Sequence, residues 1–132
     1  MRAWGIDGCR AGWLAVSIDA AGKRGFTIVE RITQLAALDD ATVFIDIPIG
    51  LPDSGYRGCD LAARRLLKGA QSRVFLGLRR PLLDYLNDYK AANAWAKRDG
   101  KGLAKQAFNI LPKIAEIDAL MASFMPLIPR DP

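Results

Sequence analysis

The hydrophobic pattern of the chain changes near Gly55, and this change limits the folds that the chain can adopt. Before it, short apolar segments with a period of two are typical of β-strands, whereas after it apolar residues recur at helical spacing. A chain of 132 residues suits one domain. We therefore expect a single α/β domain, with residues 1–56 mostly in strands, residues 57–125 mostly in helices and residues 126–132 as a loose tail.

Four segments of the first half have the character of strands. We expect residues 3–7, 12–19 and 25–31 to form an antiparallel meander, with turns at Asp7-Gly8 and at residues 20–23. In the second strand, Leu14, Val16 and Ile18 alternate with Trp13, Ala15 and Ser17, and we expect the aliphatic side to face the core. Residues 42–47 are rich in β-branched residues, which predicts a buried strand, parallel to the first and central in the sheet.

The second half predicts helices over residues 59–69, 81–87, 89–98 and 111–124, and a further short helix is expected over residues 34–39. Gly69 suits a helix C-cap, and Pro112 suits the first turn of a helix. Gly100 and Gly102 separate the last two helices. Together with the strands, these helices predict a mixed sheet followed by a helical half.

Composition excludes several classes of protein. Hydrophobic residues make up 51% of the chain, enough for a core, but no apolar stretch approaches the length of a membrane span. The N-terminus lacks the apolar run of a signal peptide, and Cys9 and Cys59 lie far apart, so we expect free thiols in the cytoplasm and no membrane partner. The absence of histidine excludes Ser-His-Asp and Cys-His catalysis and the usual zinc sites within this chain.

Positive charge is concentrated in one segment. Residues 57–80 hold seven basic residues and one acid, whereas residues 1–56 hold five basic residues and seven acids. A basic stretch of this kind is typical of a surface that binds an anionic partner such as nucleic acid. A solvated basic helix face would give the same pattern, and both interpretations stay open.

Two aspartates stand out by their positions. Asp7 ends the first predicted strand, and Asp46 lies within the fourth, between two isoleucines. If these strands are parallel neighbours, the two carboxylates meet near the carboxyl ends, where oxygen ligands suit Mg²⁺ or Mn²⁺. Such an ion would offset the cost of burying Asp46, and two ions about 4 Å apart support phosphodiester hydrolysis. Alternatively, Asp7 starts a turn and Asp46 accepts hydrogen bonds from the segment after Pro48.

Several motifs resemble one known family along nearly the whole chain. The segments are GIDGCRAGW (residues 5–13), IDIPIGL (45–51), RGCDLAAR (57–64), YKAAN (89–93) and GKGLAKQAFNILPKIAEID (100–118). They resemble the predicted ribonuclease H-like nucleases grouped as domain of unknown function four-two-nine.

The resemblance implies a ribonuclease H-like α/β fold with catalytic, metal-binding acids at Asp7 and Asp46. It implies a divalent-metal-dependent nuclease or phosphodiesterase, a hydrolase using magnesium or manganese. Basic residues near the site would bind nucleic acid or phosphate, with polar residues in support; in this sequence they are Arg57, Arg64, Lys105 and Lys113, and Asp60, Gln106, Glu116 and Asp118. Asp60 and Arg64 also have the spacing of an ion pair on one helix face, and Lys113 and Glu116 equally suit an exposed helix face.

The sequence departs from the family pattern in two places. A Ser-Ser-Val-Phe-Pro-like stretch is replaced by SRVFLG at residues 72–77. Family members also continue with a further strand, a His-Pro-Glu-like motif and an acidic helix, so we expect a C-terminally truncated member with an incomplete site. Self-association into a homo-oligomer would cover the sheet edge left exposed.

Two other functions remain open. The chain would be a non-catalytic nucleic-acid-binding or assembly module if the late acids are required for catalysis. It would be a nucleotide-binding protein of the actin and sugar-kinase type if the Asp7-Gly8 segment holds phosphate, although no second phosphate-binding glycine loop is evident.

Overall fold

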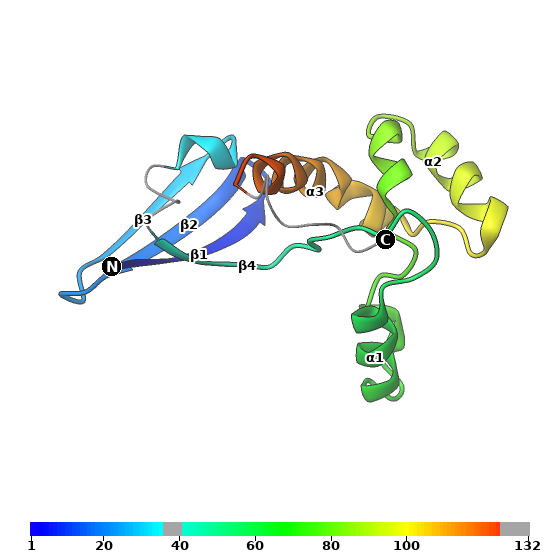
Figure 1. Cartoon of the computed structure of the whole chain (residues 1–132), viewed down its shortest axis with the longest axis horizontal. Coiled ribbons are helices and arrows are strands. Elements are labelled where there is room, and N and C mark those ends of the chain that lie inside the picture. Colours follow the sequence, from blue (N-terminus) through cyan, green and yellow to red (C-terminus); the bar gives the residue numbers. More distant parts are fainter. Residues whose placement is uncertain (36–40, 125–132) are drawn as a thin grey trace. The chain divides into compact units, whose positions relative to one another are not determined.

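The computed structural model describes residues 1–35 and 41–124 (Figure 1). The chain divides into two compact units, each described here by itself. The sheet unit contains residues 1–49 together with the chain from residue 116 onward, and the helical unit contains residues 50–115. The α/β class is confirmed, whereas the expectation of a single domain over residues 1–132 stays a prediction.

The described part of the sheet unit contains four strands: β1 (Arg2–Cys9), β2 (Gly12–Asp19), β3 (Arg24–Val29) and β4 (Ala41–Ile45). Their order is β3-β2-β1-β4, with β1 antiparallel to β2, β2 antiparallel to β3, and β1 parallel to β4 (Figure 1). The antiparallel meander and the parallel fourth strand are therefore confirmed. The central, buried position expected for the fourth strand is wrong, because β4 is an edge strand among the described ones and Phe44 is 67% exposed.

The first turn lies later than expected. Asp7 and Gly8 continue the ladder by pairing with Leu14 and Trp13, and the chain reverses only at residues 10–11. Gly12 then follows with a φ of 133°, and a Cβ atom there would lie 2.2 Å from the carbonyl oxygen of Val29. Glycine is therefore required at this position, because the backbone of β3 occupies the space of a side chain.

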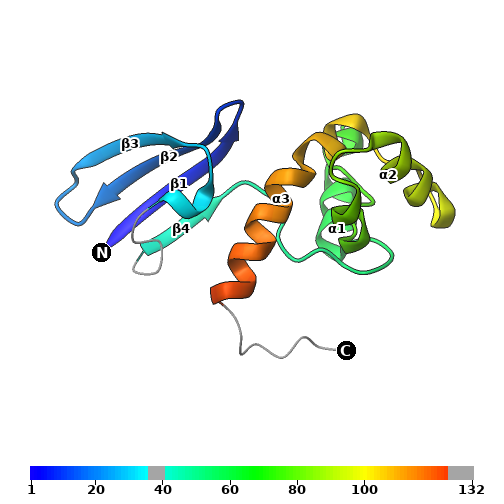
Figure 2. The same cartoon turned by 90° about the horizontal axis from the view of Figure 1, so that it is seen from above.

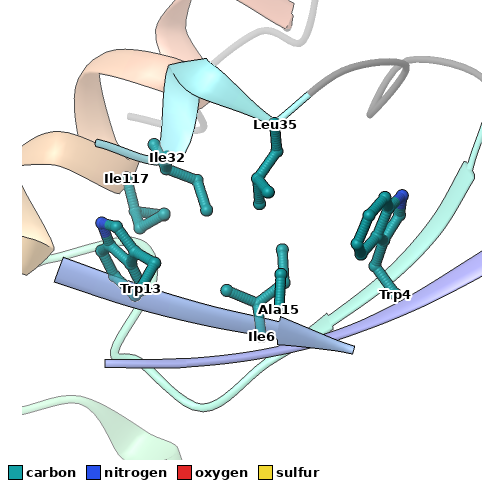
Figure 3. Packing of buried hydrophobic residues seen from close by; sticks show 7 residues of the cluster. All are labelled: Trp4, Ile6, Trp13, Ala15, Ile32, Leu35 and Ile117. Atoms are coloured by element: carbon teal, nitrogen blue, oxygen red, sulfur yellow. The ribbon is translucent and has the colours of Figure 1, made fainter. Parts of the chain in front are cut away.

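The core of the sheet unit lies on the face of the sheet that carries Trp13 and Ala15, both fully buried. Figure 3 shows the side chains of Trp4 and Ile6 from β1 on the same face, under Ile32, Leu35 and Ile117. The expectation that Leu14, Val16 and Ile18 face the core is wrong. The register places Trp4, Trp13 and Ile6 on one face of the sheet, and the burial of two large indole rings favours this face as the core.

Two short elements complete this unit. The 3₁₀-helix η1 (Ile32–Gln34) and the last part of α3 (Lys105–Phe124) cover the core face, Ile117 being the contact from α3 (Figure 3). The helix expected over residues 34–39 falls mostly on residues outside those described, as does the tail at residues 126–132.

The helical unit contains α1 (Gly58–Leu66), η2 (Gln71–Arg73), η3 (Arg80–Tyr85), α2 (Tyr89–Ala96), η4 (Lys97–Asp99) and the start of α3 (Figure 2). The helices expected near residues 59–69 and 89–98 are confirmed with shorter bounds, whereas residues 81–87 form mainly a 3₁₀-helix. Pro112 lies inside α3 and not in its first turn, because α3 begins at Lys105. No described helix has the length and apolar character needed to cross a bilayer.

The core lies on the face of the sheet opposite to the expected one, and this gives the first prediction. Replacing Trp13 by alanine should lower the free energy of unfolding by about 3–5 kcal/mol, because it leaves a cavity among buried side chains. Replacing Phe26, which is 79% exposed on the other face, should change it by less than about 0.5 kcal/mol. Urea titration of both variants measures this contrast. Equal losses would mean that the two faces are equally covered in solution.

Candidate functional site

The parallel pairing of β1 with β4 brings Asp7 and Asp46 together. Ile6 and Ile45 are partners in the register, so the aspartates that follow them lie side by side on neighbouring strands. The backbone N–H of Asp46 donates to the carbonyl oxygen of Ile6 at 3.4 Å, which holds Asp46 against β1 just beyond the end of β4. Neighbouring strands lie about 4.8 Å apart, within the span that one cation can bridge.

Both carboxylates lie on the face of the sheet opposite to the core. Alternation along β1 turns Asp7 away from the buried Ile6, and Asp7 and Asp46 are both exposed. The sequence argument that Asp46 is a buried carboxylate in need of compensation is therefore wrong. Its position next to Asp7 does not depend on burial, because the strand register fixes it.

The two aspartates line an open hollow of about 480 Å³ on this face. Its other lining residues come from the middle of the same strands: Gly5 and Ile6 of β1, Leu14 and Val16 of β2, and Phe44 and Ile45 of β4. Two carboxylates supply oxygen donors of the kind that Mg²⁺ and Mn²⁺ prefer. Within the described residues, no group of three or more acids, cysteines or histidines is placed to hold a metal ion.

The basic segment belongs to the helical unit, and many of its charges have local partners. Arg79 is 3% exposed, donates to the carbonyl oxygens of Gly77 and Ala96, and lies 4.7 Å from the Trp95 ring centroid. This residue stabilises the interior and does not present its charge to a partner. The charges of residues 57–80 are thus not one continuous surface.

Three other arginines of this segment also make intramolecular contacts. Arg57 pairs with Asp60 at 3.6 Å, and Arg64 donates to the carbonyl oxygen of Val74, so Asp60 pairs with Arg57 in place of the expected Arg64. Arg80 lies 3.9 Å from Asp53. The exposed basic side chains of the segment are Arg65, Lys68 and Arg73. Arg57 and Arg64 were selected from the family resemblance of residues 57–64, and a sequence motif does not separate paired from exposed arginines.

The residues taken from the late family-like block lie along α3. Lys105, which is exposed, packs its ammonium 4.3 Å from the ring centroid of Tyr89, and Gln106 is exposed. Lys113 is half-buried, and all three belong to the helical unit. Asp118 is half-buried in the sheet unit.

Glu116 has a defined structural contact. Its Oε1 accepts a hydrogen bond from the backbone N–H of Ile32, at the start of η1. This contact lies on the core side of the sheet, next to Ile117, whereas Asp7 and Asp46 lie on the other face. Glu116 therefore fastens η1 to α3 and is not part of the group around the two aspartates.

Sequence reasoning missed the hollow beside the carboxylates. The hollow follows from the strand register, which the pattern within a single strand does not define. Gly5 lies between Val16 and Phe44, so a position without a side chain is flanked by larger apolar residues. The expectation that Phe44 belongs to a buried strand concealed this feature.

The fold and the site thus define an α/β protein with a mixed sheet and an aspartate pair on two neighbouring parallel strands, Asp7 within β1 and Asp46 just beyond β4. A family model described as protein of unknown function (DUF429) matches residues 5–128. The chain therefore belongs to this family. No curated protein and no solved structure matches the chain in the comparisons made.

The contact of Glu116 gives the second prediction. Glu116→Ala should lower the free energy of unfolding by about 1–3 kcal/mol, because the N–H of the buried Ile32 loses its acceptor. Glu116→Gln should lower it much less, because the amide oxygen can still accept that bond. Thermal unfolding of the two variants separates these outcomes. Equal losses in both would contradict an acceptor role and indicate that charge matters instead.

Proposed function

We propose that this protein is a divalent-metal-dependent phosphodiesterase or nuclease of the ribonuclease H-like type, with Mg²⁺ or Mn²⁺ held by Asp7 and Asp46. The observation that carries the proposal is the position of two exposed aspartates side by side on parallel strands, lining one hollow. Two adjacent carboxylates repel each other and attract a cation. They also repel phosphate, so an anionic substrate approaches this end of the sheet only when a cation is bound.

The donor set fits a hard cation. Mg²⁺ is commonly bound by one or two carboxylates, with water and substrate phosphate completing its coordination, so a third protein ligand is not required. When bound, such an ion supplies charge stabilisation to the attacking and leaving oxygens of phosphodiester hydrolysis.

The residues of the chain contribute position and access. Asp7 lies within β1, and the backbone N–H of Asp46 donates to the carbonyl oxygen of Ile6 in the same strand. Both carboxylates are therefore attached to a paired backbone that limits their movement. Because both are exposed, a phosphodiester reaches them without opening the core.

Supporting roles for Arg57, Arg64, Lys105 and Lys113 at phosphate stay predictions, as do those of Asp60, Gln106 and Asp118. A cytoplasmic setting and a homo-oligomeric state are likewise proposals, the former supported by the free thiols Cys9 and Cys59.

Metal binding gives a prediction of its own. Adding Mn²⁺ should raise the melting temperature of the wild type, because a ligand that binds only the folded state stabilises it. The increase should be lost in Asp7→Asn and in Asp46→Asn, and kept in the matched control Glu30→Gln, an exposed acid of the same unit. Differential scanning fluorimetry provides the measurement. An increase in melting temperature that persists in both aspartate variants would show that Mn²⁺ does not bind at Asp7 and Asp46.

Catalysis gives the next prediction. Incubation with a panel of labelled single-stranded, double-stranded and hybrid nucleic acids should show cleavage of at least one of these classes, and the cleavage should depend on Mn²⁺ or Mg²⁺. Asp46→Asn should lower the rate by more than about a hundredfold, since even outer-shell partners of metal sites contribute 10–100-fold. Glu30→Gln again serves as the control. Metal-dependent cleavage that is undiminished in Asp46→Asn would contradict the proposal.

The exposed basic residues of the helical unit favour a second candidate, a non-catalytic nucleic-acid-binding module. Arg65, Lys68 and Arg73 are exposed and require no metal to contact phosphate. This candidate is distinguished by salt-dependent oligonucleotide binding that survives Asp46→Asn and is lost when the three basic residues are replaced by glutamine.

A further inference from the structure

The open face of the sheet carries more than the aspartate pair. The register groups its side chains into rows that run across the strands. One row contains the acids, with Asp7 and Asp46 next to Leu14 and Ile28. The neighbouring row contains Phe26, Val16, Gly5 and Phe44, one from each strand. Phe44 is 67% and Phe26 79% exposed, which is unusual for rings on a four-stranded sheet whose other face forms the core.

Gly5 makes a gap in the second row. It lies between Val16 and Phe44, and a Cβ atom placed on it would have no neighbour within 4 Å. The hollow is located here, with the exposed Phe44 on one side and the carboxylates at one end. The two rows are two residues apart along the strands, or about 7 Å. A flat group resting over Gly5 against Phe44 is therefore next to anything bound at the acids.

The chemistry of the lining restricts what can occupy this hollow. A purely apolar partner would bury Asp7 and Asp46 without counter-charges, which is costly. A wholly polar ligand would leave Phe44 and Val16 unmatched. Among the residues that the structure describes, none with a basic side chain lines the hollow, so an anionic group is accepted only beside a bound cation. The occupant must combine a flat apolar ring with a group that binds a metal ion, and a nucleotide has both.

We propose that this hollow receives an unpaired nucleotide, whose base stacks on Phe44 over Gly5 while its phosphate lies at the Asp7–Asp46 end. The inference rests on the proposed function and specifies its substrate class as single-stranded nucleic acid or unpaired ends. Exposed aromatic side chains on a sheet bind bases in this way irrespective of sequence. Within a duplex the faces of a base are covered by its neighbours, so a paired base does not reach Phe44.

The test compares two probes that contain no phosphodiester bond to cut. Adenosine 5′-monophosphate and ribose 5-phosphate carry the same phosphate, and only the first has a base. Isothermal titration in Mg²⁺ should give about tenfold or tighter binding of the nucleotide, as expected for one stacked base. The ratio of the affinity for adenosine 5′-monophosphate to that for ribose 5-phosphate should fall close to one in Phe44→Ala and be retained in Phe44→Trp. Phe26→Ala is the matched control, because Phe26 is exposed on the same face but does not line the hollow.

A second variant separates binding from folding. Gly5→Val should abolish the preference for the nucleotide by filling the gap, while the melting temperature stays the same or rises, since valine suits a strand better than glycine does. In competition experiments, a single-stranded oligonucleotide should displace the nucleotide, and a blunt duplex of the same sequence should not.

The outcomes decide between the two proposals. Equal binding of both probes by the wild type, or an unchanged ratio in Phe44→Ala, overturns the stacking inference even where Mn²⁺ still stabilises the protein through Asp46. If Asp46→Asn abolishes stabilisation by Mn²⁺ but Phe44→Ala does not change the ratio of the two affinities, the proposed function is supported and the stacking inference is overturned. If Phe44→Ala and Phe26→Ala both lower the mass measured by sedimentation, a second copy covers this face and the inference is likewise overturned.

Discussion

The parallel pairing of β1 with β4 determines where the functional groups of the sheet unit lie. Parallel strands run in the same direction, so the residues that come after paired positions on two neighbouring strands lie next to each other, toward the carboxyl ends of both strands. Here that rule makes neighbours of Asp7 and Asp46, which are far apart in the sequence. The antiparallel pairing of β1 with β2 then adds Leu14 and Val16 beside them. The hollow and the carboxylates are thus consequences of one strand arrangement, and a shift of one residue in β4 would turn Asp46 toward the core.

Local patterns predicted the strands well and the burial of their faces poorly. The bounds of β2 were predicted correctly, because its alternation is regular and Gly12 and Asp19 mark its ends. Alternation defines two faces but does not say which one is covered. The aliphatic row of β2 is the more hydrophobic by residue type, yet the core forms where Trp13 packs with Ile6 and Ile117, and Ile117 lies far along the chain. A pattern within one strand contains no information on that contact.

The aspartate pair could be predicted, and its surroundings could not. Asp7 and Asp46 were found from their places in two predicted strands, whose parallel pairing is confirmed. The charge pattern was less informative, because Arg79 is buried against Trp95 and Arg57 is paired with Asp60. The contact that buries Arg79 comes partly from Ala96, 17 residues further along the chain, which the pattern of its own segment does not reveal. Pro112 was misplaced for a different reason, because α3 begins earlier, at Lys105, and contains the proline in its interior.

The helical unit is inserted in the sequence of the sheet unit, between residues 49 and 116. This has a consequence for the order in which the protein is made. All four strands leave the ribosome before Ile117, which completes their core, has been synthesised. During that interval the tryptophan face of the sheet lacks its helical cover, and the intervening segment must fold or be held in a long loop before closure. The nascent chain is therefore most exposed to aggregation or chaperone binding while residues 50–115 are being translated.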